Sequence, residues 1–200
     1  MPKLRGAGPL QWVLANGETE TGVTTMRINA GLDTGDMLLK AVTAIDPDEN
    51  ARELGERLAP IGAQLLIETL TGLASGTIVP EPQNDAEATH APILSKEDGH
   101  IDWSWPAIRI HNRTRGFNPW PGTATSFRGA SLRIWKTRVA LESTLLLPGR
   151  ITSNKGPLIV SCANSSQIEL LEVQQEGRKR VSGTDFRNGL RIVENEFLGE

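Results

Sequence analysis

Two carboxylates and two glycines occur within six residues, in the run Gly31-Leu32-Asp33-Thr34-Gly35-Asp36. Asp and Gly are the residues that tight turns use, so the simplest interpretation is a turn between two strands. An Asp-Thr-Gly triplet is also typical of aspartic proteases, in which two facing aspartates share one proton. Such a protease needs a small residue after the glycine, whereas here Asp36 follows, and its charge would disturb the shared proton. We therefore reject the protease interpretation.

Other reactive side chains are few. Cys162 is the only cysteine, which excludes an internal disulfide and a metal site built from several thiolates. Its neighbours at 158–161 are mostly apolar, so we expect a buried structural thiol in a strand. The histidines, none of which is near Asp33 in the sequence, are expected to have surface or packing roles: His90, His100 and His111. We predict no metal site.

The net charge of −3 conceals an uneven distribution along the 200 residues. Residues 1–100 hold 7 Lys and Arg against 15 Asp and Glu, whereas residues 101–200 hold 14 against 9. A basic second half favours contact with a polyanion such as nucleic acid, and a solvated basic face is the alternative. Five cations on an expected helix or strand are the candidates for following a phosphate backbone: Arg109, Arg113, Arg133, Lys136 and Arg138.

The run around Asp33 needs flanking elements to hold it, and the sequence predicts two strands. Residues 22–28 are rich in β-branched side chains and partly alternate, and residues 37–45 form a second run of this type. We expect a hairpin with the turn at its centre, preceded by a short helix at 10–16.

A long helix is expected after the hairpin. Apolar residues recur at three- and four-residue steps from Leu54 to Leu73, which predicts an amphipathic helix. Asn50 and Glu53 have the spacing of a capping box at its start. Pro60 cannot donate the intrahelical hydrogen bond, so it predicts a kink or a break.

The second half has a different pattern. Residues 77–98 lose helical periodicity and contain three prolines, so we expect an interdomain linker. A short helix follows, with Ser104 as its cap, and a last helix starts after Ser182. Between them the period changes to two, with strands expected at 123–127, 132–138, 150–152, 158–162 and 168–173 and a turn at 154–156. Five short strands favour a small barrel of the oligonucleotide-binding (OB) type.

Several ordered segments closely resemble folate-dependent formyltransferases. They lie at 2–11, 17–24, 31–37, 92–98 and 101–103. A further run, Arg115-Gly116-Phe117-Asn118-Pro119-Trp120-Pro121-Gly122, is typical of methionyl-tRNA formyltransferases. The resemblance covers most of the chain and weakens after about residue 140, and agreement of several motifs in order is far more specific than one triplet.

The resemblance implies a fold of the class α/β plus all-β. Residues 1–76 would be the C-terminal part of a Rossmann-like formyltransferase catalytic domain, and residues 77–98 a linker. Residues 99–200 would be an OB-like β-barrel domain that binds tRNA.

The resemblance also implies an activity. The family transfers a formyl group from 10-formyltetrahydrofolate to the amino group of methionyl initiator tRNA, in translation initiation. Asp33 would be the catalytic aspartate, which orients a histidine and a water and stabilises the imidazolium form. The folate pocket would be lined by Pro2, Leu32, Thr34 and Gly35. We expect a cytoplasmic protein with tRNA and folate partners and no membrane contact.

The sequence departs from the family pattern at its start. The family's histidine and asparagine come from a motif upstream of a Pro-Lys-x-Arg-Gly segment, and this sequence begins at that segment, Pro2-Lys3-Leu4-Arg5-Gly6. We therefore expect little activity from the chain alone. The protein would be either a monomer or dependent on a missing N-terminal half. The alternatives are a formyltransferase for a nucleotide-linked amino sugar and a non-catalytic tRNA-binding fragment.

Overall fold

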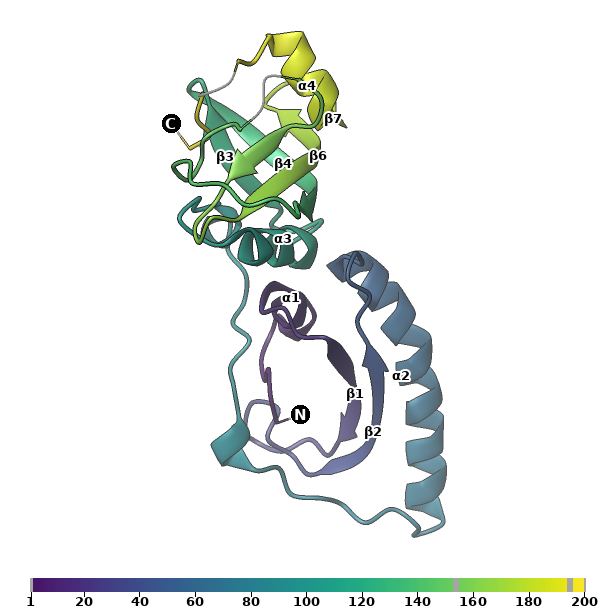
Figure 1. The fold of residues 1–200 in the computed structure, drawn as a ribbon. Helices are drawn as coiled ribbons and strands as arrows, with labels where there is room; N and C mark the ends of the chain where they lie inside the picture. Colours follow the sequence, from purple (N-terminus) through teal and green to yellow (C-terminus); the bar gives the residue numbers. More distant parts are fainter. Residues whose placement is uncertain (1, 153–154, 194–195, 200) are drawn as a thin grey trace. The chain divides into compact units, whose positions relative to one another are not determined.

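The computed structural model describes residues 2–152, 155–193 and 196–199 (Figure 1). The chain divides into two compact units. The first unit comprises Met1–Leu14 and Glu18–Leu94, and the second comprises Ala15–Gly17 and Ser95–Glu200. Among the described residues, no helix combines the length and the apolar character needed to cross a membrane.

The first unit is built on the predicted hairpin. Helix α1 (Pro9–Ala15) precedes strands β1 (Glu20–Met26) and β2 (Met37–Ala44), which pair antiparallel with Val23 opposite Ala41. Strand β1 ends two residues earlier than expected, directly after its register with β2 shifts between Thr25 and Met26. The amide of Arg27 donates to the carbonyl of Asp36 (2.9 Å) where the loop begins.

Helix α2 (Ala51–Ala74) covers the hairpin and begins with the predicted capping box. The side chain of Asn50 accepts from the amide of Glu53 (3.1 Å), and the Glu53 carboxylate accepts from the amide of Asn50 (2.9 Å). The predicted break at Pro60 is wrong, because the helix runs through it without interruption. Pro60 is exposed, as is Glu56, so water can satisfy the Glu56 carbonyl that has lost its donor.

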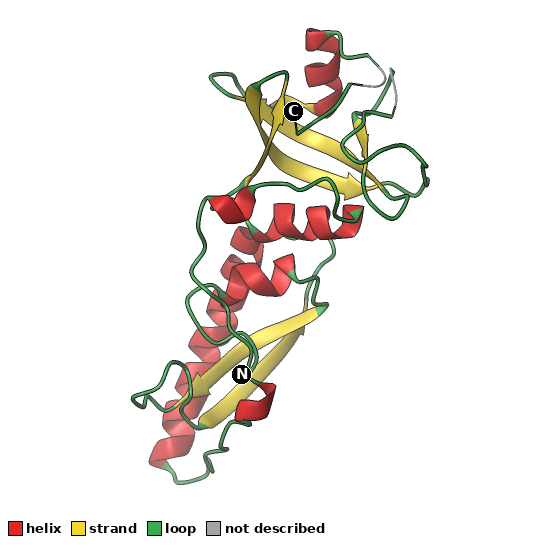
Figure 2. Cartoon of the chain, turned by 90° about the vertical axis from the view of Figure 1, so that its left-hand side faces the viewer, coloured by secondary structure: helices red, strands yellow, loops and turns green. Residues whose placement is uncertain are grey.

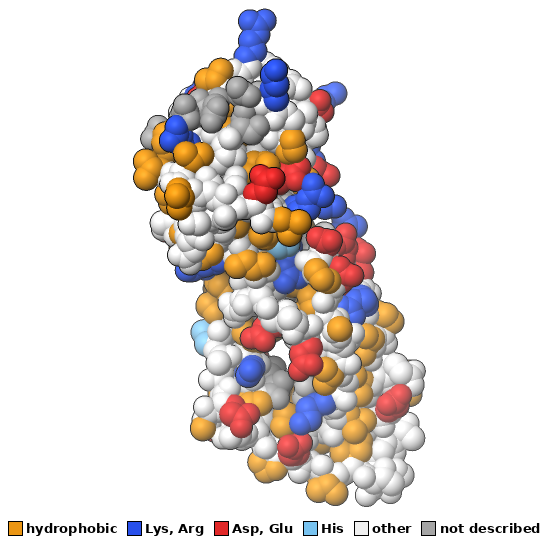
Figure 3. Space-filling model, in the orientation of Figure 1, with side chains coloured by type: hydrophobic (Ala, Val, Ile, Leu, Met, Phe, Trp, Pro, Cys, Tyr) orange, Lys and Arg blue, Asp and Glu red, His pale blue; other side chains and the backbone are white. Residues whose placement is uncertain are grey.

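Helix α2 is apolar on two sides. Leu54 and Leu65 are buried, and Thr69 on the same side bonds to Thr25 of β1 (2.8 Å). The other side is exposed, and apolar side chains reach the surface along this helix (Figure 3). The exposed fractions there are 50% for Leu66, 60% for Ile67 and 59% for Leu70.

Residues 77–94, here called the strap, belong to the first unit. Glu81 exchanges two main-chain hydrogen bonds with Met37 at the start of β2, both 2.8 Å long. Further along, the amide of Ala91 donates to the carbonyl of Arg5 (2.7 Å), and the amide of Arg5 donates to the carbonyl of Thr89 (2.9 Å). Most of the segment expected to be a linker is therefore hydrogen-bonded along the first unit. The strap includes the 3₁₀ turn Asp85–Glu87.

The second unit is a curled antiparallel sheet with helices beside it (Figure 2). The strand order is β3-β4-β6-β5, with β7 paired to β6. The strands are β3 (Thr123–Phe127), β4 (Ala130–Val139), β5 (Ile159–Ser161), β6 (Gln167–Gln175) and β7 (Val181–Ser182). The helices are α3 (Ala107–Gly116) and α4 (Gly183–Leu190), preceded by the 3₁₀ turn Glu97–Gly99.

Three local predictions for the second unit need comment. The expected strand at 150–152 is reduced to isolated bridges at Arg150 and Ile151, and β7 is present instead. Helix α3 has Pro106, not Ser104, at its N-cap, without a side-chain cap. The expected turn at 154–156 lies partly outside the described residues, since Asn154 is not among them.

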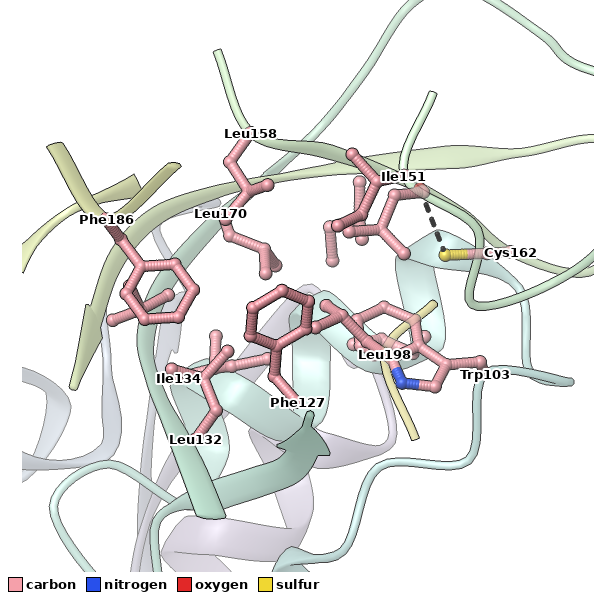
Figure 4. Close-up of a cluster of buried hydrophobic side chains, with 14 of the residues drawn as sticks. Trp103, Phe127, Leu132, Ile134, Ile151, Leu158, Cys162, Leu170, Phe186 and Leu198 are labelled. Atoms are coloured by element: carbon pink, nitrogen blue, oxygen red, sulfur yellow. Dashed lines mark hydrogen bonds between the residues drawn. The ribbon is translucent and has the colours of Figure 1, made fainter. Parts of the chain in front are cut away.

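The core of the second unit is a cluster of buried apolar side chains from the sheet, α3 and α4 (Figure 4). Phe127 and Phe186 meet edge to face, with ring centroids 5.8 Å apart. Cys162 is 2% exposed at the side of this cluster, and burial raises the pKa of its thiol to about 12. The expected burial of this thiol is confirmed, but Cys162 lies one residue after the end of β5 and not in the strand.

Candidate functional site

The turn that carries Asp33 has a fixed backbone. Asp33 adopts φ +53°, a left-handed conformation that is uncommon outside glycine. At Gly35 a Cβ atom would lie 1.7 Å from the carbonyl oxygen of Arg27, so only glycine fits. The side chain of Asn29 closes the turn by accepting from the amide of Gly31 (3.1 Å) and the hydroxyl of Thr34 (2.8 Å).

The Asp33 carboxylate is held at one oxygen and available at the other. Its Oδ2 accepts from the amide of Gly6 (2.9 Å), which lies in the segment before α1. In the described part of the chain no group donates to Oδ1, and the side chain is half-buried. Such a carboxylate can accept a hydrogen bond from a further group and stabilise a cation there.

Gln83 of the strap touches the same turn from the other side. Its Nε2 donates to the carbonyls of Asp33 (2.9 Å) and Gly35 (2.7 Å). Its Oε1 accepts from Nε (3.1 Å) and Nη2 (2.9 Å) of Arg5. The sequence pattern does not indicate Gln83, because a glutamine in a polar, proline-rich run has no distinguishing signal.

Three of the four residues expected to contact folate lie beside Asp33 in the structure. Leu32, Thr34 and Gly35 share its turn, with the Leu32 side chain 61% exposed and Gly35 buried. Pro2 lies on the segment that includes Gly6, so its link to the turn is through that segment. Within the described residues, no group of three or more His, Cys, Asp or Glu side chains could hold a metal ion.

Two of the expected nucleic-acid contacts meet on α3. The guanidinium carbons of Arg109 and Arg113 lie 4.2 and 4.6 Å from the ring centroid of Trp105. Arg113 also donates to the carbonyl of Asp98 (3.1 Å). Burial, and then repulsion from Arg109, lower the pKa of Arg113 below its usual value. Stacking on the indole orients both cations without neutralising them.

The other expected contacts lie on β4. Arg133 and Arg180 stack on Trp135, with guanidinium carbons 4.9 and 4.0 Å from a ring centroid of the indole. The register of β4 with β6 shifts beside Trp135, so Lys136 remains on the exposed side. Sequence reasoning missed Trp105 and Trp135 as parts of these clusters, although an aromatic within a few residues of two arginines was a readable signal.

These cations differ in how far carboxylates neutralise them. Arg138 forms an ion pair with Glu169 across the sheet (2.6 Å), and Arg180 pairs with Glu172 (3.0 Å). Among the described side chains no carboxylate lies within ion-pair distance of Lys136. The five predicted residues therefore lie in two groups, one on α3 and one on β4. In the β4 group, Arg138 is paired with a carboxylate.

Comparison with known protein families identifies the family of this chain. Residues 1–70 match the family described as formyl transferase, and residues 93–191 match the formyl transferase C-terminal domain. The chain belongs to the formyltransferase family. The resemblance drawn from the sequence is confirmed, and both the Asp33 turn and the two cationic groups lie within the matched regions of this formyltransferase chain.

Curated relatives of the formyltransferase chain are similar over its whole length. A methionyl-tRNA formyltransferase of Solibacter usitatus is 60% identical over 200 residues, which are 100% of the chain and 64% of that relative. A methionyl-tRNA formyltransferase of Caldanaerobacter subterraneus subsp. tengcongensis is 47% identical, over 99% of the chain and 64% of the relative. The chain thus spans about 64% of the length of these relatives.

Solved structures share the fold of this formyltransferase chain at low identity. The N-formyltransferase from Helicobacter canadensis, solved with folinic acid and dTDP-3-aminofucose, gives a TM-score of 0.69 at 20% identity, over 88% of the chain and 63% of that structure. The methionyl-tRNA formyltransferase from Clostridium thermocellum gives 0.51 at 20% identity, over 71% and 60%. These likenesses concern the fold alone.

Proposed function

We propose that this chain supplies the Asp33 side of the catalytic site and the tRNA-binding domain of a methionyl-tRNA formyltransferase. The reaction is transfer of formyl from 10-formyltetrahydrofolate to the amino group of methionyl initiator tRNA. The observation that carries the proposal is the 60% identity, over the whole chain, to a relative of that name. The held carboxylate of Asp33 supplies a chemical group that the reaction needs.

In the proposed reaction the neutral amine attacks the formyl carbon and a new C–N bond forms. The carbonyl oxygen becomes an oxyanion, the bond from the formyl carbon to the folate nitrogen breaks, and the amine proton is passed to the leaving nitrogen. The free Oδ1 of Asp33 accepts a hydrogen bond from the family's upstream histidine and stabilises its imidazolium form. Asp33 acts as a fixed acceptor because Gly6 and the turn hold it.

The folate donor is proposed to bind beside the same turn, against Pro2, Leu32, Thr34 and Gly35. The exposed Leu32 side chain offers apolar contact to a flat ring system. The absence of a side chain at Gly35 lets the backbone of Arg27 pack against the turn that carries Leu32 and Thr34. These features fit an aromatic ring lying near the Asp33 carboxylate.

The tRNA is proposed to bind the second unit through Arg109, Arg113, Arg133, Lys136 and Arg138. Duplex RNA is recognised mainly by shape and by phosphate and 2′-hydroxyl contacts, so cations held on stacked indoles suit it. Of the five, Arg138 contributes least, because Glu169 neutralises it.

The proposal also assigns a fold type to each part of the chain. Residues 1–76 form the C-terminal part of a Rossmann-like catalytic domain and 99–200 an OB-like barrel. Residues 77–98 form the linker, of which 77–94 run along the first unit as the strap. The curled antiparallel sheet of the second unit supports the OB-like assignment. The protein would work in the cytoplasm, as a monomer or completed by the N-terminal part of the catalytic domain.

Two alternatives remain distinct from this proposal. A formyltransferase for a nucleotide-linked amino sugar is favoured by the TM-score of 0.69 to the Helicobacter canadensis enzyme. A tRNA-binding protein without catalysis is favoured by the cations that stack on Trp105 and Trp135 in the second unit. The identities of 60% and 47% to tRNA enzymes outweigh the 20% to the sugar enzyme.

The test is formylation of methionyl initiator tRNA with 10-formyltetrahydrofolate. The purified chain is assayed alone and mixed with the separately expressed N-terminal third of the Solibacter usitatus relative. We expect little turnover alone and formylation in the mixture, strongly lowered but still measurable in Asp33→Asn and retained in the neighbouring control Asp36→Asn. Formylation of an amino-sugar nucleotide instead of tRNA would support the sugar enzyme, and tRNA binding without any formylation would support the tRNA-binding protein without catalysis.

A further inference from the structure

We propose that Gln83 is a positioning residue for Asp33, and that the strap therefore takes part in forming the catalytic site. The inference rests on the proposed role of Asp33. Gln83 lies 50 positions after Asp33, in the segment whose sequence pattern predicts only a connection between domains. Its side chain does not reach a reacting atom in this proposal, and it acts through the backbone of the turn.

The amide of Gln83 can have only one orientation at this place. Its partners on one side are the carbonyls of Asp33 and Gly35, which only accept, so Nε2 must face them. Its partner on the other side is the guanidinium of Arg5, which only donates, so Oε1 must face it. The amide therefore joins an acceptor pair to a donor pair, which no apolar side chain can reproduce.

Arg5 anchors this amide to the rest of the first unit. Arg5 is 8% exposed, and its Nη2 also pairs with Asp85 of the strap at 2.8 Å. Its main chain bonds to Thr89 and Ala91, as described for the strap. Gln83 thus holds the turn against a buried cation that is itself fixed at several atoms.

The hydrogen bonds form a closed cycle around Asp33. The amide of Gly6 holds the Asp33 carboxylate, and Gly6 directly follows Arg5. Arg5 binds Gln83, and Gln83 returns to the carbonyl of Asp33. Both the side chain and the main chain of Asp33 are therefore held by the neighbouring residues Arg5 and Gly6, the side chain directly and the main chain through Gln83.

A catalytic carboxylate gains from such fixation. Asp33 has a left-handed φ of +53°, which costs free energy and persists only where surrounding contacts impose it. Without Gln83 the carbonyls of Asp33 and Gly35 lose their donor, and the turn can relax. A displacement of about 1 Å at a catalytic group can lower the rate by about 100-fold.

The first test reads the geometry in the full chain, with no substrate. The Gly6 amide proton shift in the NMR spectrum reports its bond to the Asp33 carboxylate, and Asp33→Ala supplies the value for a lost bond. Gln83→Glu keeps an acceptor for Arg5 but removes the donor to the turn, and Gln83→Met removes both. The matched controls are Gln64→Glu and Gln64→Met, because Gln64 lies exposed on α2 and bonds only to Glu68.

We expect both Gln83 variants to move the Gly6 shift by more than half of the way to the Asp33→Ala value, with the other amide signals retained. The Gln64 controls should leave it in place. A Gly6 signal unchanged in Gln83→Glu overturns the proposal. If that variant unfolds, the same comparison is decided by Gln83→Met, which introduces no charge.

The second test reads catalysis in the mixture that formylates tRNA. Gln83→Glu should lower kcat at least tenfold while changing KM for tRNA and folate less than about twofold. In an Asp33→Ala background the same substitution should have no further effect, because both act through one group. Equal losses in both backgrounds would overturn the proposal. If the wild-type mixture formylates nothing, the proposed function fails, and the Gly6 shift still decides whether Gln83 holds the turn.

Discussion

Lys136 is expected to make one phosphate contact with tRNA, and this contact should make binding more sensitive to salt by a measurable amount. It is exposed on β4, and among the described residues no carboxylate lies within ion-pair distance. Each phosphate contact contributes about 0.7–0.9 to the slope of log K against log salt. Within the described part of the chain, three of the five cations have no carboxylate within ion-pair distance: Arg109, Arg133 and Lys136. Three phosphate contacts predict a slope of about −2 to −3.

Lys136→Gln should reduce this slope by about 0.7–0.9. If the binding curves converge near 1 M salt, the variant should bind about fivefold to eightfold more weakly at 0.1 M monovalent salt. The matched control is the double variant Arg138→Gln/Glu169→Gln, which removes the 2.6 Å ion pair without changing the net charge. It should change affinity by less than about twofold, because the paired charges of Arg138 and Glu169 cancel and present no net charge to a phosphate.

The assay is a titration of fluorescent initiator tRNA with the full chain at several salt concentrations. An unchanged slope in Lys136→Gln would show that this cation does not meet a phosphate. An equal loss in the double variant would show that Arg138 leaves Glu169 to bind the RNA. Either result would refute the ranking of cations by their carboxylate partners.

Three further outcomes follow from the burial and charges described above. Cys162 should react with a disulfide reagent at pH 8 roughly 1000-fold more slowly in the folded chain than in urea, because a pKa of about 12 leaves little thiolate. Gly35→Ala should lower the free energy of unfolding by about 1–3 kcal/mol in urea titrations, whereas Gly189→Ala, with open space around it, should not. The hydrogen bond from Arg128 lowers the pKa of Glu196, so this pair stabilises above about pH 4.5 and the effect is lost as pH falls. Glu196→Gln should therefore cost up to about 1 kcal/mol at pH 7 and progressively less in acid.

Elements with a local signal could be predicted from the sequence. The capping box at Asn50 and Glu53 marks the start of α2, since both hydrogen bonds join residues three apart. Ser182 likewise caps α4 by accepting from the amide of Asp185 (3.0 Å). Strand β3 lies at the expected residues because its alternation continues directly into the turn with β4.

Elements that depend on distant partners could not be predicted in this way. Arg150 and Ile151 alternate as a strand would, but their partners are single residues, Phe197 and Val160, from different segments. Two unconnected bridges do not make a ladder. Pro60 is tolerated because its place in α2 is exposed, a property that depends on what the helix packs against.

The same distinction applies to the candidate site. Asp33 is indicated by a compact motif, and the family match includes it. Gln83 is reached only through hydrogen bonds that span 48 to 78 positions, which no periodicity records. Its neighbours in the sequence are prolines and polar residues, so composition favoured a linker.

The return of the strap to the Asp33 turn also sets an order of assembly during protein synthesis. A ribosome adds about 5–20 residues per second, so Gln83 follows Asp33 by roughly 3–10 s. In that interval the β1–β2 hairpin and α2 can form from local contacts, but the carbonyls of Asp33 and Gly35 still lack their donor. The turn is translated early and completed late. A nascent chain that stops before the strap would carry the whole Asp33 motif without the two hydrogen bonds from Gln83.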